Sequence, residues 1–257
     1  MDEPRAGPEV GYTAEQVRAA ERPLLDRGEP LMHRAAAALA DEISELLRTT
    51  DAAADRHRAG PLVLVLAGSG DNGGDALFAA AHLAERGADV RVVAVGSRLH
   101  EAGAGAARAA GARRLRPDAD RAGFAATVAR ADVIVDGILG IGAAASPALR
   151  GPARDVVACI RTELGQEWID RAGGGTRHPL VVAVDLPSGI SPDDGSVPDP
   201  TVLPADVTVT MGAVKAGLLL EPAVGLVGRV VLVDLGLGPA LAGVRSAVRR
   251  GRRRDPS

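Results

Sequence analysis

Aromatic residues and cysteine are scarce in this sequence of 257 residues. Phe, Trp and Tyr make up 2% of it, which is too little to build the stacking platforms that bind single-stranded nucleic acids. A formal net charge of −3 provides no basic field for duplex DNA or RNA, so we expect no specific nucleic-acid partner. A single cysteine, Cys159, excludes an internal disulfide and a cysteine zinc site, and it indicates a reducing compartment.

Long apolar runs and targeting signals are also missing. No apolar run approaches the roughly 20 residues that span a bilayer, and the opening MDEPRAGPEV lacks the basic stretch and apolar core of a signal peptide. We therefore expect a cytoplasmic protein with no membrane partner. Lysine and asparagine occur once each, as Lys215 and Asn72. In a chain that elsewhere uses arginine in place of lysine, these single residues indicate chemistry that no other residue supplies, or they occur by chance.

Hydrophobic residues at 46% and charged residues at 25% are typical of a globular domain with a sizeable core. Continuous apolar segments of strand length alternate with helical patterns, which predicts an α/β, Rossmann-like fold of three layers with a mostly parallel sheet. The predicted strands are 62–66, 90–95, 133–136, 180–184, 207–211 and 230–233.

Two further segments complete the predicted organisation. Residues 12–47 have apolar residues at helical spacing and predict an N-terminal helical extension that acts as a lid or arm. We predict a single domain over residues 1–248 and a basic tail over residues 249–257 that frays in solvent. Weak, salt-dependent binding of polyanions is the alternative for the tail.

Three predicted turns follow strands and are rich in polar or small residues: 68-GSGDNGGD-75, 136-DGILGIG-142 and 185-DLPSGI-190. In open α/β sheets, ligands bind beyond the carboxyl ends of the strands, so we expect these turns to converge on one site. The first turn lacks the Walker pattern and has only a loose dinucleotide fingerprint. Its carboxylate and amide oxygens suit a hard cation or sugar hydroxyls, and a plain helix cap is the alternative.

The second and third turns each place a carboxylate at the predicted crevice. Asp136 ends an apolar strand, although a carboxylate there is also consistent with an exposed strand end or a helix cap. Asp185 precedes Pro187 and Ser188, and both polar side chains are expected to face the crevice. Serine hydrolase chemistry is not supported, because Ser188 lacks the Gly-x-Ser-x-Gly surroundings.

Together these segments resemble the NAD(P)H-hydrate epimerase family, the epimerase half of the nicotinamide-hydrate repair system. The resemblance covers about residues 12–237. Its motifs in this chain are 31-LMHRAA-36, 71-DNGGD-75, 133-VIVDGILGIG-142, 181-VVAVDLPSGI-190 and 211-MGAVKAGLLL-220. The chain departs from the family pattern at Asp71, which replaces asparagine, at Ile141, which replaces threonine, and in the longer loop 143–150.

The resemblance implies an isomerase for metabolite repair, which interconverts the R and S forms of NADH and NADPH hydrated at ring carbon 6 (NADHX and NADPHX). It implies a bound potassium ion held by Asn72, Asp136 and Ser188, and catalytic roles for Asp185 and Lys215. A separate dehydratase acting on the product and a homodimer are the expected partners. The implied substrate-binding residues are Asp71, Asn72, Gly73, Gly74, Asp75, Gly140, Ile141, Gly142, Ala143, Ala144, Ala145, Ser146 and Asp185.

Two other functions compete with this interpretation. A catalytically silent scaffold that binds a nucleotide or a protein is disfavoured, because the polar residues of all three turns and Lys215 are retained. A nicotinamide-dependent dehydrogenase is disfavoured by the poor fingerprint and by the lack of a ribose-binding acid near 90-VRVVAV-95.

Overall fold

The computed structural model describes residues 10–49, 60–143, 145–169 and 179–249. At its centre lies a seven-stranded sheet with the order β4-β3-β2-β5-β6-β7-β8, in which every neighbouring pair of strands is parallel. The predicted α/β, Rossmann-like fold with a mostly parallel sheet is therefore confirmed. The strands of this sheet are β2 (Leu62–Ala67), β3 (Asp89–Ala94), β4 (Arg113–Leu115), β5 (Val133–Gly137), β6 (Leu180–Val184), β7 (Val207–Met211) and β8 (Arg229–Val233).

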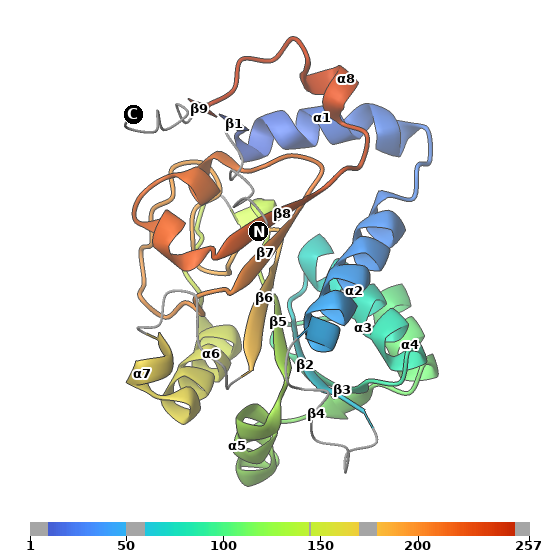
Figure 1. Ribbon diagram of the computed structural model, residues 1–257, viewed down its shortest axis with the longest axis vertical. Helices are drawn as coiled ribbons and strands as arrows, with labels where there is room; N and C mark the ends of the chain where they lie inside the picture. The colour runs from blue at the N-terminus through green and yellow to red at the C-terminus, as the bar shows by residue number, and fades with distance from the viewer. Residues whose placement is uncertain (1–9, 50–59, 144, 170–178, 250–257) are drawn as a thin grey trace.

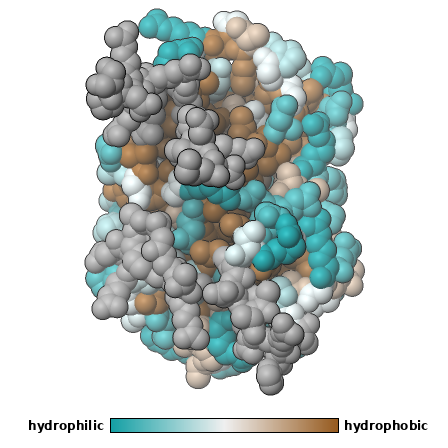
Figure 2. Space-filling model, viewed as in Figure 1, coloured by the Kyte–Doolittle hydropathy of each residue, from teal (hydrophilic) through white to brown (hydrophobic). Residues whose placement is uncertain are grey.

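Helices cover both faces of this sheet. In Figure 1, α2, α3 and α4 lie on one side of it, and α5, α6 and α7 lie on the other. On the face shown in Figure 2, hydrophilic residues (teal) gather along the right-hand edge, the side on which Figure 1 places α2, α3 and α4. The helices are α1 (Ala14–Asp26), α2 (Leu31–Thr49), α3 (Asp71–Glu85), α4 (Glu101–Ala109), α5 (Arg121–Arg130), α6 (Gly151–Leu164), α7 (Gln166–Ile169) and α8 (Gly238–Leu241), with 3-10 turns η2 (Ile141–Ala143), η3 (Ala216–Leu219) and η4 (Ala223–Leu226).

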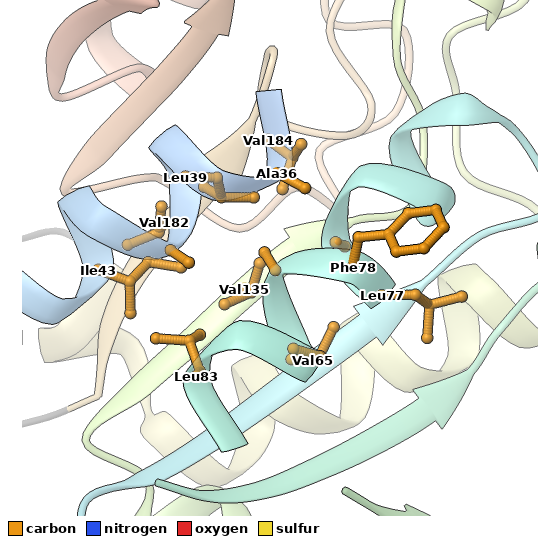
Figure 3. Packing of buried hydrophobic residues seen from close by; sticks show 14 of the residues in the cluster. Ala36, Leu39, Ile43, Val65, Leu77, Phe78, Leu83, Val135, Val182 and Val184 are labelled. Atoms are coloured by element: carbon orange, nitrogen blue, oxygen red, sulfur yellow. The ribbon is translucent and has the colours of Figure 1, made fainter. Parts of the chain in front are cut away.

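The core lies between the sheet and the two helical layers. Along β2, Val63 and Val65 pack with α2 and α3, whereas Leu64 and Leu66 pack with α5 and α6, as the two-residue period of a strand requires. Figure 3 shows the first of these layers, with Leu39 and other side chains of α2 directed at α3 and the strands. Burial of both strand faces explains why the strands read as continuous apolar runs.

Strand β4 was not predicted. It contains only three residues, Arg113–Leu115, and it pairs with β3 at the edge of the sheet. Two of its three side chains are exposed arginines, so the sequence carries no apolar run there.

The N-terminal segment forms two helices rather than one extension. Thr13 caps α1 in a capping box with Gln16, and the chain turns at Gly28, whose φ of +74° is in the left-handed region. Helix α2 then packs into the core, so the prediction of a lid or arm is wrong for this half. Helix α1 remains apart from the sheet, beside α8 at the top of Figure 1.

The first and last described residues pair in a second, small sheet. Strand β1 (Val10–Gly11) pairs antiparallel with β9 (Val248–Arg249), so Arg249, the first residue of the predicted tail, lies in a strand. Residues 250–257 of that tail lie outside the described residues, and the single domain over 1–248 stays a prediction. In the part of the chain that the structure describes, no helix is both long enough and apolar enough to cross a membrane.

The strand order fixes where a ligand can bind. Strand β3, the next in the chain, lies on one side of β2, and β5 lies on the other side. The direction in which successive strands are added therefore reverses between β2 and β5. The crevice at such a reversal is where open α/β sheets bind ligands. The segments after β2 and β5 carry two of the three predicted turns.

Candidate functional site

The segments after β2 and β5 lie in direct contact. A Cβ added to Gly68 would stand 1.9 Å from the carbonyl oxygen of Ile138, so only glycine allows this approach. The Gly68 N–H donates to the carbonyl of Gly137 at 3.0 Å. The turn is shorter than the predicted 68–75, because α3 already begins at Asp71. The motif 71-DNGGD-75 is therefore the first turn of a helix, in which the N–H groups of Asp71, Asn72 and Gly73 have no partners within the helix, whereas the Gly74 N–H donates to the Gly70 carbonyl at 3.2 Å.

Asn72 connects all three predicted turns. Its side-chain Nδ2 donates to the carbonyl of Leu139 at 2.9 Å, in the second turn, and to the carbonyl of Val184 at 2.6 Å, immediately before the third. The side chain is buried, and a Cβ on Gly140 would stand 2.7 Å from Asn72 Oδ1. Among the residues singled out in the sequence, Asn72 thus occupies the centre of the crevice.

Asp136 and Ser188 are joined by two hydrogen bonds. The Ser188 Oγ–H donates to Asp136 Oδ1 at 2.6 Å, and the Ser188 N–H donates to Oδ2 at 2.8 Å. The N–H of Leu139 in turn donates to Ser188 Oγ at 2.8 Å. Burial raises the pKa of Asp136, against the smaller opposite effect of these hydrogen bonds. The oxygens of Asp136, Ser188 and Asn72, predicted to hold a cation, come from segments that are bonded to one another.

Asp185 and Lys215 form a buried ion pair. Asp185 has a φ of +69°, a conformation that aspartate tolerates better than most residues. Lys215 Nζ donates to Asp185 Oδ1, to Thr210 Oγ1 at 3.3 Å and to the carbonyl of Met211 at 2.8 Å. The two side chains are 7% and 1% exposed, respectively, so water cannot replace either partner.

The two oxygens of the Asp185 carboxylate differ. Oδ1 also accepts from the Met211 N–H at 3.1 Å and from the Thr210 hydroxyl at 3.3 Å. No hydrogen bond from any described residue reaches Oδ2. The carboxylate is thus held by one oxygen, and the other is left for a ligand.

Asp75 is buried near this pair. It is 9% exposed, and its Oδ1 is the one buried side-chain polar atom of the described residues without a hydrogen-bond partner. Burial raises the pKa of Asp75 well above its usual range, and the negative charges of Asp185, Asp71 and Glu21 add to the effect. The raised pKa and the unpaired Oδ1 make Asp75 a candidate proton donor near Asp185.

Helix α1 adds residues that the motifs did not identify. Burial raises the pKa of Glu21, and the positive charge of Lys215 has the opposite, smaller effect. Glu21 therefore interacts electrostatically with the buried pair of Asp185 and Lys215. Arg18, one turn earlier, donates to the carbonyl of Ile141. The helical spacing could have identified Glu21, because it lies four residues after the apolar Val17 and residues four apart share a face of a helix. Val17 is buried, so Glu21 lies on the inner face of α1.

The start of the loop 140–146 lies against α1. Ile141, which replaces the threonine of the family pattern, packs against apolar residues of α1 and α8 and so has a packing role. Gly142 and Ala145 are exposed, and Ser146 Oγ accepts a hydrogen bond from Arg150 at 2.7 Å. Ala144 lies outside the described residues. The loop reaches the crevice through Gly140, which contacts Asn72.

Comparisons with known proteins agree with this geometry. The chain is 51% identical over 242 residues to the NAD(P)H-hydrate epimerase of Clavibacter sepedonicus, with 94% of this chain and 96% of the relative covered. It is 37% identical over 230 residues to the bifunctional NAD(P)H-hydrate repair enzyme Nnr of Mycobacterium tuberculosis, of which it covers 41%.

Comparisons with a solved structure and with a family model extend this result. The crystal structure of yeast ynu0 shares the fold with a TM-score of 0.68 at 18% identity, and 95% of this chain and 97% of that chain are covered. The family described as YjeF-related protein N-terminus matches residues 28–217, which include α2, the first six strands of the central sheet and Lys215. The chain therefore belongs to the YjeF-related protein N-terminus family.

Proposed function

We propose that this protein is an NAD(P)H-hydrate epimerase, which interconverts the R and S forms of hydrated NADH and NADPH at ring carbon 6. The observation that carries the proposal is the bonding of the Asp185 carboxylate. Its Oδ1 accepts hydrogen bonds from Lys215 and from the Met211 N–H, whereas its Oδ2 has no hydrogen-bond partner among the described residues. Two relatives that the chain covers almost completely bear the name NAD(P)H-hydrate epimerase. No net redox change takes place, so the nicotinamide nucleotide is the substrate and not a cofactor.

The reacting carbon is a carbinolamine, which bears a hydroxyl group and is bonded to ring nitrogen 1. Protonation of the hydroxyl allows the C6–O bond to break as the nitrogen lone pair forms a C=N bond, and water leaves. Water then adds to either face of the flat iminium ion and loses a proton. A path through an opened ring erases the same stereocentre. Either path needs a group that gives a proton and a group that takes one.

Asp185 and Asp75 fit these two needs. Asp185 Oδ2 lies free to accept a proton from attacking water, while Lys215 holds the carboxylate in place through the other oxygen. Burial, and after it the neighbouring negative charges, raise the pKa of Asp75 well above its usual range, which suits Asp75 to give a proton to the leaving hydroxyl. Lys215 is thus proposed to position Asp185, and its charge balances that of the carboxylate.

The substrate would lie along the crevice between β2 and β5. The N-terminal turn of α3 presents unpaired N–H groups that suit the pyrophosphate, and Gly73 lets this turn lie close to the segment after β2, since a Cβ there would stand 2.2 Å from the Gly68 carbonyl oxygen. The segment from Gly140 to Ser146 would cover the nicotinamide ribose. The Asp185 end of the crevice would then receive the hydrated ring.

A potassium ion is proposed at the Asn72, Asp136 and Ser188 oxygens. The donor set fits: it contains one carboxylate, one amide and one hydroxyl, without sulfur or imidazole, as a hard cation of single charge prefers. The ion would supply positive charge beside the substrate-binding turns. Because Asn72 Nδ2 now faces two carbonyls, Asn72 Oδ1 is the atom that would turn toward the ion. A homodimer, a cytoplasmic location and a separate dehydratase acting on the product are further proposals.

The test is direct. Purified protein is mixed with the R form of hydrated NADH in potassium buffer, and conversion to the S form is followed by chromatography. Asp185→Asn should slow the conversion by about 10²- to 10⁴-fold, the usual contribution of one acid–base group. Asp41→Asn is the matched control, because Asp41 pairs with Arg86 on the exposed side of α2.

Two results would favour other functions. Binding of the hydrated nucleotide without conversion would indicate a silent scaffold. Unchanged conversion by Asp185→Asn would show that Asp185 takes no part in the chemistry, and the protein would still be an epimerase.

A further inference from the structure

A cavity of about 690 Å³ opens beside the start of α3, on the side of the crevice opposite to β6. Its walls are the segment after β2, the segment after β3 and the exposed side of α4. Glycines leave it open: a Cβ added to Gly70 or Gly105 would meet no atom within 4 Å. The polar residues that line it are Ser69, Asp71, Arg98, His100, Glu101 and Arg108.

The two loops that form the cavity are held together. A Cβ on Gly96 would stand 2.1 Å from Ser69 Oγ and 2.6 Å from Ser69 N, so glycine is required where the segment after β3 meets the segment after β2. The Arg98 N–H donates to Ser69 Oγ at 3.5 Å. The position of the Arg98 backbone relative to α3 is thus fixed by the fold.

The cavity contains donors without partners. Arg98 and Arg108 have exposed side chains, and neither guanidinium makes an ion pair or hydrogen bond with any residue that the structure describes. His100 Nδ1 accepts the N–H of Gly103 at 3.1 Å, which leaves the ring proton of neutral His100 on Nε2. Two guanidinium groups and a ring N–H around one space suit a phosphate dianion.

Carboxylates are present too. Asp71 and Glu101 also line the cavity, and they can accept hydrogen bonds from ribose hydroxyls or from an adenine amino group. Asp71 belongs to the predicted substrate-binding motif, so this cavity and the crevice share a residue. The set of donors and acceptors therefore matches a phosphorylated nucleoside better than a simple anion.

The place in the fold is informative as well. Dinucleotide-binding sheets read the ribose 2′ position at the end of the strand that follows the first crossover: an acid there binds the 2′ hydroxyl, and an arginine accepts a 2′-phosphate. That strand is β3, which ends at Ala94, and no acid stands at Ala94 or at Val95, which follows it. Arg98 follows in the same segment.

We infer that this cavity binds the adenosine end of the substrate, with Arg98 and Arg108 holding a 2′-phosphate, so that hydrated NADPH is preferred over hydrated NADH. The inference rests on the proposed function for the identity of the substrate. The dinucleotide then spans the reversal point, with its hydrated ring at Asp185 and its adenosine at β3.

The first experiment measures kcat/KM for both hydrated nucleotides. In Arg98→Ala and in Arg108→Ala, the ratio of the NADPH form to the NADH form should fall about tenfold to a hundredfold, the usual effect of losing a hydrogen bond to a charged group. Gly105→Leu, which places a side chain in the open cavity without a change of charge, should weaken the use of both forms. Arg121→Ala is the matched control, because Arg121 lines a separate cavity beside α5 and α6. An unchanged ratio in both arginine variants, or a ratio that falls in Arg121→Ala, would overturn the inference.

The second experiment does not depend on activity. Calorimetry compares adenosine 2′,5′-bisphosphate with adenosine 5′-monophosphate on the full chain at constant ionic strength. Tighter binding of the bisphosphate, lost in Arg98→Ala and kept in Arg121→Ala, supports the cavity even for a protein that fails to epimerise. Equal affinity for the two nucleotides refutes it, whereas the proposed function would still stand on measured epimerisation.

Discussion

The buried pair of Asp185 and Lys215 allows stability and catalysis to be separated. Lys215→Met removes the ammonium group and keeps an unbranched side chain of similar length. The Asp185 carboxylate then stays buried without its cationic partner. Since both side chains are almost fully shielded from solvent, no water can take the place of Nζ.

The expected loss of stability is large. Removal of one partner from a buried ion pair costs about 3–5 kcal/mol, a sizeable part of the roughly 5–15 kcal/mol that stabilises a folded domain. The lost bonds to Thr210 and to the Met211 carbonyl leave further buried groups without a donor. For a chain of this size, each kcal/mol lowers the midpoint of thermal unfolding by about 2–4 °C, so the midpoint should fall by roughly 6–20 °C.

The double variant Asp185→Asn/Lys215→Met should regain most of this loss. It buries no charge, and neutral replacements of a buried ion pair are often nearly neutral for stability. Turnover, however, should stay about 10²- to 10⁴-fold below that of the unaltered protein. Lys215→Arg should keep the charge but lose turnover, because a planar guanidinium does not fit the space of an ammonium group that is 1% exposed.

The assay combines urea and thermal unfolding of the two single variants and the double variant with steady-state kinetics on the same preparations. A double variant no more stable than either single variant would refute the buried-pair reasoning. Full activity in Lys215→Arg would reduce Lys215 to a simple positive charge. Full activity in Lys215→Met would show that it has no part in catalysis.

Three more outcomes are expected. The folded-state pKa of Asp75 is raised, so the fold loses stability as the pH rises through and above the pKa that this group has in the unfolded chain. Asp75→Asn should therefore be more stable than the unaltered protein at pH 8 and not at pH 3. A stability difference between the two proteins that does not change with pH in urea unfolding would contradict this. Crystals soaked in rubidium should show an anomalous peak within reach of Asn72 and Ser188, and its absence would count against the cation site. Gly68→Ala should cost about 1–3 kcal/mol by urea unfolding, because its Cβ would stand 1.9 Å from a backbone carbonyl, whereas Gly105→Ala, which faces open space, should cost nothing.

Much of the architecture was predictable, because it depends on patterns of apolar and polar residues that are close together in the sequence. Apolar runs of strand length marked six strands of the central sheet, and their alternation with helices predicted parallel pairing. Polar residues at the ends of β2, β5 and β6 predicted a shared crevice, since parallel strands end at the same edge. Strand β4, with two exposed arginines, carried no such pattern.

The sequence by itself therefore determined the α/β layers, the family and the loops that meet at the crevice. Only the tertiary structure decided the contacts within it: that Ser188 bonds to Asp136, that Asn72 joins three segments, and that Oδ2 of Asp185 stays open. Asp185 and Lys215 are 30 residues apart in the chain, and their pairing depends on how β6 and β7 lie side by side. Local periodicity encodes which face of an element is buried, whereas distances between side chains of different elements exist only once the sheet has formed.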